Sequence, residues 1–263
     1  MFKKIAVVSL LLITMTGLAQ DEHKKAAQLM KQGNFKDALV LLEEAITAYP
    51  DWYYPILLKG QCNLKLGNYK DALASYNDVL TLELDSKEVP KVKYYIAQCY
   101  MKLKDYPKAI HAYTELAPIA PQSKKFDVFM NRGQAEMQIA KKAEEKNDRK
   151  KANSYYSKAV VSFSESLKYP AGRKDMSIEA LFQKAYSQYK IGNFKGGINS
   201  LETSIQAFKD VIAENPKEKR AHTFLINLAF QIVDKVPKNR KDSKYSDVVT
   251  YIERYLTHWP GDV

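Results

Sequence analysis

Apolar residues recur along most of the chain at spacings of three, four and seven, a period that predicts amphipathic helices. Polar and charged residues fill the positions between them. No segment alternates apolar and polar residues or carries a run of β-branched residues in the way strands do. The pattern therefore predicts an all-α fold.

A short turn motif punctuates these helical segments. Its sequence is Gly-Asn-aromatic-Lys at residues 33–36, 67–70 and 192–195, with a looser copy at 104–107. Glycine readily adopts the left-handed conformation that ends a helix, and Asn or Asp is favoured as the cap of the next helix. Each copy is therefore expected to join two helices, with its aromatic residue filling the gap between them.

Fixed offsets from the turn aromatic mark the faces on which these helices pack. The residue nine positions before it is small, the residue three after it is also small, and the residue seven after it is larger and apolar. The three sets are Ala26, Gly60, Ala97 and Ala185; Ala38, Ala72, Ala109 and Gly197; and Leu42, Tyr76, Tyr113 and Leu201. Such offsets place the residues on one helical face, where small side chains allow a close approach. Gly196 and Gly197 are expected just inside the second helix, where they permit close packing.

Motif and spacing together resemble the tetratricopeptide repeat, a helix-turn-helix unit of about 34 residues. The first two turn aromatics, Phe35 and Tyr69, are 34 residues apart. The resemblance implies a right-handed α-solenoid of about six helix pairs with a concave groove. Three regular repeats are expected over residues 21–123. Stretched and degenerate repeats are expected to continue the solenoid over 124–263.

The C-terminal pairs depart from the regular spacing. In the fourth pair, Gly133 fits the small residue of the first helix, and Tyr156, Ala159 and Phe163 fit the opening of the second. The excess length falls in the charged stretch 141–151, which is either a first helix running long into solvent or a mobile loop. The fifth pair should have a long second helix that ends near Asn215. The last pair should contain a loop at 237–243.

The first twenty residues have the features of a secretory signal peptide. Lys3 and Lys4 precede an apolar run from Ile5 to Ile13, and small residues lie near a cleavage point between Ala19 and Gln20. The run is shorter than the roughly 20 residues that span a bilayer, so a permanent membrane anchor is the weaker interpretation. We therefore expect a soluble mature protein in the periplasm, in the cell envelope or outside the cell.

Charge narrows the choice of partners only slightly. The formal net charge is +11 and falls to +9 without residues 1–20. A basic chain often binds nucleic acid, but export makes that partner unexpected. An anionic envelope surface or acidic protein faces fit better, and a soluble, self-repelling surface is the simpler explanation.

The resemblance also implies which residues face the groove, because the first helix of each pair lines the concave surface in this family. Positions 12, 8, 5 and 4 before the turn aromatic lie on one helical face. The candidate protein-binding residues are Leu57, Gln61, Leu64, Lys65, Tyr94, Gln98, Met101, Lys102, Phe182, Tyr186, Tyr189 and Lys190. The lysines either bind acidic groups or simply end their helices, where a cation favours the dipole. Tyr186 and Tyr189 suit either binding or repeat packing.

Residues for other chemistry are sparse. The four His residues lie far apart and lack metal-binding spacing, and no phosphate-binding or nucleophile motif occurs. We expect no enzyme activity, no cofactor and no metal. Cys62 and Cys99 occupy equivalent positions in successive repeats, about a helix-packing distance or more apart, so two free, buried thiols are expected. The predicted function is an exported adaptor that binds envelope or secreted proteins in its concave face; the alternative is a basic protein docking on anionic glycan or lipid.

Overall fold

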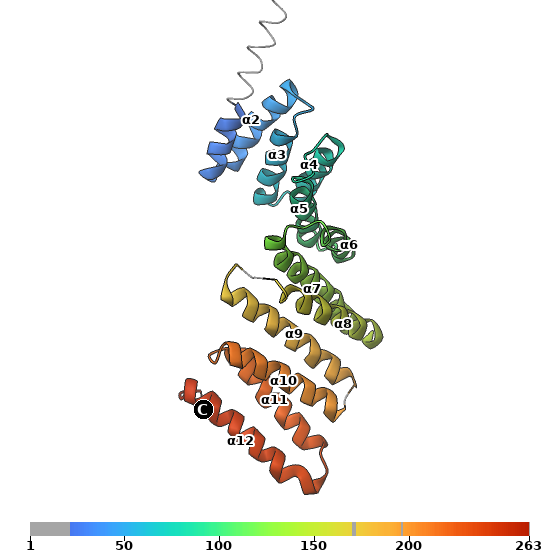
Figure 1. Ribbon diagram of the computed structural model, residues 1–263, viewed down its shortest axis with the longest axis vertical. Coiled ribbons are helices and arrows are strands. Elements are labelled where there is room, and N and C mark those ends of the chain that lie inside the picture. Colours follow the sequence, from blue (N-terminus) through green and yellow to red (C-terminus); the bar gives the residue numbers. More distant parts are fainter. Residues whose placement is uncertain (1–21, 170–171, 196, 263) are drawn as a thin grey trace, which may run out of the picture. The chain divides into compact units, whose positions relative to one another are not determined.

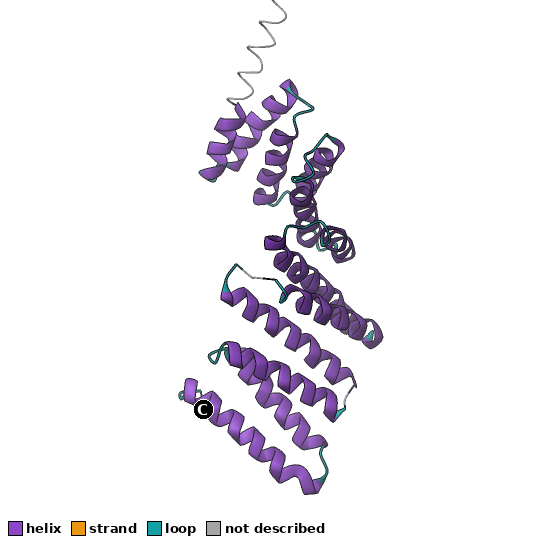
Figure 2. Cartoon of the chain, viewed as in Figure 1, coloured by secondary structure: helices purple, strands orange, loops and turns teal. Residues whose placement is uncertain are grey.

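The computed structural model describes residues 22–169, 172–195 and 197–262. Figure 2 shows helices joined by short turns, and the described residues contain no strand. The all-α prediction is confirmed. The predicted signal peptide lies outside the described residues. None of the described helices combines the length and apolar character needed to cross a membrane.

The chain divides into two compact units between Ile119 and Ala120. Each contains consecutive helix pairs in the arrangement of an α-solenoid (Figure 1). Unit 1 contains a helix over residues 22–31, followed by α2 (Phe35–Ala48), α3 (Tyr53–Leu66), α4 (Tyr69–Thr81), α5 (Val89–Lys102) and α6 (Tyr106–Leu116). Unit 2 contains α7 (Gln122–Glu145), α8 (Arg149–Ser166), α9 (Lys174–Lys195), α10 (Ile198–Glu214), α11 (Lys219–Lys235), the 3-10 turn η1 (Lys238–Arg240) and α12 (Lys241–His258).

The turns of unit 1 have the predicted backbone geometry. Gly33 and Gly67 adopt positive φ angles of 86° and 85°, and Lys104 takes the same role at 58°. The capping prediction holds only for Asp105, whose side chain accepts a hydrogen bond from the backbone N–H of Lys108. Asn34 and Asn68 occupy the cap positions, but neither side chain caps its helix.

The fourth pair is regular at its turn, contrary to the prediction that Tyr156 opens its second helix. Asn147 adopts a positive φ of 57°, and the Asp148 side chain accepts a hydrogen bond from the N–H of Lys151. The second helix thus begins at Arg149, and Tyr156 lies seven residues inside it. The stretch 141–151 is neither a mobile loop nor a helix projecting into solvent, since Ala143 is buried and α7 packs along α8.

The extra length of this pair lies on both helices, away from the turn. Helix α8 begins at Arg149, which takes the place of the turn aromatic. Ala140 lies nine residues before it, at the small position, and Tyr156 lies seven residues after it, at the bulky position. Both are fully buried. Gly133 lies seven residues earlier than Ala140, and Phe163 lies seven residues later than Tyr156. A Cβ atom on Gly133 would come within 2.7 Å of the Phe163 ring. The two helices therefore continue in register for two more turns.

The fifth turn lies later in the chain than the Gly-Asn-aromatic-Lys motif predicts. Helix α9 continues through Gly192 and Asn193 to Lys195, so Gly192 does not end the first helix. A Cβ on Gly192 would lie 3.0 Å from the backbone oxygen of Ser200, which indicates that this glycine permits close packing of α9 and α10. The packing role predicted for Gly197 is wrong, because Gly197 precedes α10 as its N-cap and its Cβ direction is open.

The boundaries of the last helices differ in one place from the prediction. Helix α10 ends at Glu214 with Asn215 as its C-cap, as expected. The loop predicted at 237–243 is shorter, because η1 occupies Lys238–Arg240 and α12 begins at Lys241. The apolar positions Val248 and Tyr251 of α12 then pack on the core of unit 2.

A small residue opposite a bulky residue holds the helices of a pair together. In the second pair, a Cβ on Gly60 would lie 2.6 Å from the Tyr76 ring. Both positions are buried, and Tyr76 is completely inaccessible. Leu42 and Leu201 occupy the bulky position in the first and fifth pairs and are likewise buried. The sequence offsets therefore identified a real packing contact.

The substitution Gly60→Ala tests this contact, because the contact decides whether the free energy of unfolding rises or falls. On helix propensity alone, Gly60→Ala should stabilise by about 1 kcal/mol. We expect it instead to lower the free energy of unfolding by about 1–2 kcal/mol, because the added Cβ would overlap a ring that is fully buried and stacked on Tyr95. Urea denaturation followed by circular dichroism measures the change.

Two further variants make this test specific. Gly172→Ala is the control, because a Cβ there meets nothing within 4 Å. The double variant Gly60→Ala/Tyr76→Leu reproduces the Ala26 and Leu42 combination of the first pair and should lose less stability than the two single changes added together. A stabilised Gly60→Ala protein would contradict the packing contact.

Cys62 and Cys99 are free and buried, as predicted. Cys62 packs with Ala26 and Leu42, whereas Cys99 belongs to the adjoining cluster with Tyr76 and Val92. Burial raises the pKa of each thiol to about 11. Both side chains therefore act as small apolar groups and are unreactive near neutral pH.

This environment predicts slow thiol modification in the folded protein. With a thiol-specific reagent at pH 8, neither cysteine should react until the protein unfolds, and two thiols should react in urea. Mass spectrometry of the non-reduced protein should show no intramolecular disulfide. A mass two units lower than that of the reduced protein would contradict the arrangement of both helices.

Candidate functional site

The predicted groove residues of unit 1 divide into one core residue and seven with accessible surface. Leu57 is fully buried among the apolar residues of α3, α4 and α5, so it offers no surface to a partner. The accessible seven lie on α3 or α5: Gln61, Leu64, Lys65, Tyr94, Gln98, Met101 and Lys102. Lys102, in the last turn of α5, is also exposed, as is Lys65 in the last turn of α3.

The same division appears in unit 2. Phe182 on α9 is only 5% exposed and contacts the rings of Phe208 and Phe224 at centroid distances of 5.9 and 6.0 Å. The guanidinium of Arg220 covers its ring at 4.1 Å. Phe182 is therefore a core residue, and Tyr186, Tyr189 and Lys190 remain as half-buried candidates on α9.

Three aromatic side chains, Tyr186, Tyr189 and Phe224, form what we call the α9 aromatic patch. The centroid distances are 6.1 Å between the two tyrosines, 5.6 Å from Tyr186 to Phe224 and 5.2 Å from Tyr189 to Phe224. All three are half-buried. Phe224 on α11 stacks on the completely buried Phe208, with 5.1 Å between centroids and 3° between planes. The core thus holds the patch in place.

Phe224 was not identified from the sequence. Groove residues on the other first helices are predicted by counting back from the aromatic residue of the turn motif. The loop between α11 and α12 lacks this motif, so the count gives no candidates on α11. An aromatic residue followed by buried residues at helical spacing, Leu225, Leu228 and Ile232, was the available signal. It indicates packing but does not indicate contact with α9.

Charged groups surround Tyr186. The ammonium groups of Lys141 on α7 and Lys190 on α9 lie 5.8 and 5.7 Å from its ring centroid, within cation–π range. Lys190 Nζ is also 2.6 Å from Glu144 Oε1, and the Tyr156 hydroxyl donates a hydrogen bond of 2.9 Å to Glu144 Oε2. Glu144 therefore links α7, α8 and α9 at the edge of the patch.

The electrostatics of Lys190 follow from these contacts. Burial alone would lower its pKa, but the hydrogen bond to Glu144 and the surrounding charges more than offset burial, so its pKa is raised above the usual lysine value. Lys190 is therefore protonated at neutral pH and paired within the unit. It also lies five residues before the end of α9, so the helix-end explanation fits Lys65 and Lys102 but not Lys190.

The described residues offer no evident metal site. No three side chains of His, Cys, Asp or Glu come together within the described ranges in a way that could hold a metal ion. What the candidate surfaces can do chemically is bind: aromatic rings provide apolar contact area, and cations at the edge attract acidic groups.

Comparison with known proteins identifies the repeats. Two family models described as tetratricopeptide repeat match residues 29–89 and 91–123. These ranges coincide with the regular helix pairs of unit 1, so residues 29–123 are tetratricopeptide repeats. No curated protein matches the chain significantly.

Solved structures share the fold over most of the chain. A tetratricopeptide repeat protein from Parabacteroides merdae has 18% identity and a TM-score of 0.57, covering 92% of this chain and 80% of its own. Pseudomonas aeruginosa pilF has 14% identity and a TM-score of 0.56, with 95% of each chain covered. YrrB, described as a tetratricopeptide protein with an unusual peptide-binding site, has 15% identity and a TM-score of 0.50, covering 84% of this chain and 93% of its own. At these identities the similarity shows the fold alone.

The pairing of Lys190 with Glu144 predicts that Lys190 and Lys102, which lies on α5 without such a pair, contribute differently to stability. Lys190→Met should lower the free energy of unfolding by about 1 kcal/mol, because Glu144 loses a charged hydrogen-bond partner. Lys102→Met is the matched control on α5, where no carboxylate of the described residues forms an ion pair with Lys102; its effect should stay within about 0.5 kcal/mol. Equal losses in urea denaturation would show that the ion pair contributes nothing.

Proposed function

We propose that this tetratricopeptide-repeat chain is an exported, non-catalytic adaptor that holds a protein partner on the faces of its first helices. The repeats and the fold make the chain a protein–protein interaction scaffold. The proposal adds the location in the envelope, the absence of bond chemistry and the binding face. The observation that carries it is the α9 aromatic patch.

The patch has the composition of a binding surface for a peptide segment. Tyr and Trp are enriched at protein interfaces because they combine large apolar area with a polar end and few rotatable bonds. Tyr186, Tyr189 and Phe224 retain accessible surface while their positions are fixed by contacts with one another. A fixed surface loses little conformational entropy on binding, which favours affinity.

The charges at the patch favour a partner segment that carries acidic groups beside apolar ones. Lys141 lies against the Tyr186 ring, and no carboxylate of the described residues forms an ion pair with it. Lys190 is neutralised by Glu144, so it contributes less to attraction than an unpaired lysine would. In unit 1, the exposed Lys65 and Lys102 would attract acidic groups in the same way. YrrB, which shares the fold, is described by its peptide-binding site, and we extend peptide binding to this chain as part of the proposal.

Export is supported by the N-terminal sequence. Lys3 and Lys4, the apolar run and the small residues before Gln20 form the pattern of a cleaved signal peptide. We propose that the mature chain works in the periplasm or cell envelope, or after secretion. Cell fractionation and N-terminal sequencing test this part separately: uncleaved protein in the cytoplasm would contradict it.

A second function is favoured by a group of exposed cations at the α7–α8 turn. Lys146, Arg149, Lys150 and Lys151 are all exposed, and none forms an ion pair with a carboxylate of the described residues. Such a group would attract an anionic glycan or lipid surface. A contact of this type weakens steeply as salt rises, whereas a contact with an apolar aromatic centre is retained in moderate salt.

The adaptor proposal predicts that a substitution in the patch removes the partner. The protein is purified from its own host after chemical cross-linking, and the partner that it carries is identified and quantified. Tyr189→Ala should reduce its recovery at least about ten-fold, since central aromatic residues of interfaces cost 2 kcal/mol or more when truncated. Tyr189 is the better choice than Tyr186, because Tyr186 packs against the cores on both sides of α9.

Phe230→Ala provides the matched control. Phe230 is an exposed aromatic residue on α11 that lies outside the patch, so its loss should leave the partner bound. Thermal unfolding must show that both variants are folded. If both retain the partner, or if only glycan or lipid is recovered and salt releases it, the adaptor proposal fails and the basic surface is favoured.

A further inference from the structure

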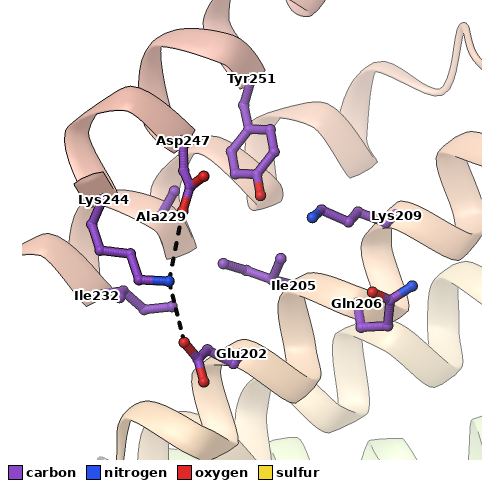
Figure 3. A pocket seen from close by; sticks show the side chains of 9 residues that line it. All are labelled: Glu202, Ile205, Gln206, Lys209, Ala229, Ile232, Lys244, Asp247 and Tyr251. Atoms are coloured by element: carbon purple, nitrogen blue, oxygen red, sulfur yellow. Dashed lines mark hydrogen bonds and ion pairs between the residues drawn. The ribbon is translucent and has the colours of Figure 1, made fainter.

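A pocket in unit 2 lies away from the α9 aromatic patch, between α10, α11 and α12. Figure 3 shows the side chains around it, and its volume is about 220 Å³. Its α10 wall is one helical face, with Glu202, Ile205, Gln206 and Lys209 at spacings of three, four and seven. Lys244, Asp247 and Tyr251 form the α12 wall at the same spacings.

The floor of the pocket is apolar. It is formed by Ala229 and Ile232 of α11, which are 4% and 2% exposed, and by the half-buried Ile205, which points into the space between the walls (Figure 3). These residues leave a small hydrophobic surface between two second helices. An apolar group placed there would cover it and lose its own contact with water.

The two ends of the pocket carry opposite charge. At one end, Lys244 Nζ lies 3.4 Å from Glu202 Oε1 and 3.6 Å from Asp247 Oδ2, so two carboxylates share one ammonium group. At the other end, Lys209 lies over the Tyr251 ring, with Nζ 5.2 Å from the centroid. No carboxylate of the described residues forms an ion pair with Lys209. The lining therefore has an acidic end and a basic end.

Two hydrogen-bond donors meet at the basic end. Figure 3 shows the Tyr251 hydroxyl and the Lys209 ammonium group facing the same space beside Ile205. Lysine contributes three donors and the phenol one, and an anion can accept from both. A carboxylate there would gain charge-assisted hydrogen bonds while lying two helical turns from Glu202 along α10.

We propose that this pocket binds a carboxylate attached to a compact apolar group, of the size of one amino-acid residue. The carboxylate lies at Lys209 and Tyr251, and the apolar group covers Ile205, Ala229 and Ile232. An N–H group of the ligand faces the acidic end formed by Glu202 and Asp247. The volume is below the roughly 300 Å³ of pockets for drug-sized ligands, which limits the occupant to about one residue. Both a free carboxylic acid and the last residue of a peptide present this chemistry.

The test uses N-acetyl-L-leucine and its uncharged amide as probes. The full mature chain is labelled at its isoleucine methyl groups, and each probe is titrated while the methyl resonances are followed by NMR. N-acetyl-L-leucine should shift the signals of Ile205 and Ile232. The amide should bind at least about ten-fold more weakly, because it lacks the charge that Lys209 recognises.

Variants locate the interaction. Lys209→Gln should weaken binding of N-acetyl-L-leucine about ten-fold, and Tyr251→Phe should weaken it less while keeping the buried ring in place. Lys217→Gln is the control, since it removes one exposed positive charge outside the pocket. A larger loss of affinity for N-acetyl-L-leucine with Lys209→Gln than with Lys217→Gln supports the site. Equal affinities for the acid and the amide, or shifts of methyl groups elsewhere only, would overturn it.

A third titration distinguishes the two sources of the ligand. A tetrapeptide ending in leucine, with a free C-terminal carboxylate, is compared with N-acetyl-L-leucine on the same signals. Tighter binding of the peptide identifies a peptide end as the occupant, whereas weaker binding identifies a free acid. The site does not include Tyr189, so Tyr189→Ala should leave these titrations unchanged even where it removes a protein partner.

Discussion

The fold depends on the contact between a small residue on one helix and a bulky residue on its partner. Where Gly60 faces Tyr76 and Gly133 faces Phe163, the backbone of one helix lies against the ring of the other. This close approach fixes the axial position of the two helices, because moving either by one residue would place a larger side chain against the ring. The buried surfaces that join one pair to the next follow from this arrangement, since each pair exposes its remaining apolar face to its neighbour.

The local signals in the sequence were sufficient for the helices and for most of this packing. The glycines at 33 and 67 marked turns because their positive φ angles suit glycine. The fourth turn was missed because Asn147 replaces glycine and Arg149 replaces the aromatic residue, so only Asp148 kept the capping chemistry. The fifth turn was misplaced for the opposite reason: Gly192 and Asn193 repeat the motif, but the close contact of Gly192 with α10 accounts for the glycine, and the helix continues.

The candidate surfaces were less predictable, because exposure depends on neighbouring pairs. A helical face wide enough to line a groove also includes positions that pack against the next helix, which is why Leu57 and Phe182 lie in the core. The pairing of Lys190 with Glu144 joins residues that are 46 positions apart, a contact that sequence spacing cannot indicate. The pocket between α10 and α12 likewise depends on how far two second helices diverge, a property of packing rather than of either sequence segment.

The length of the fourth pair has a consequence for how such chains can change in size. Seven residues complete almost two turns of an α-helix and rotate its faces by only about 20°. Adding seven to α7 and seven to α8 therefore brings a second small-and-bulky combination, Gly133 with Phe163, onto the line already defined by Ala140 and Tyr156. An addition of seven residues to only one of the two helices would leave the added face without a partner. Helix pairs of this kind can thus be lengthened by matched heptads, one on each helix, while the turn that joins them keeps its geometry.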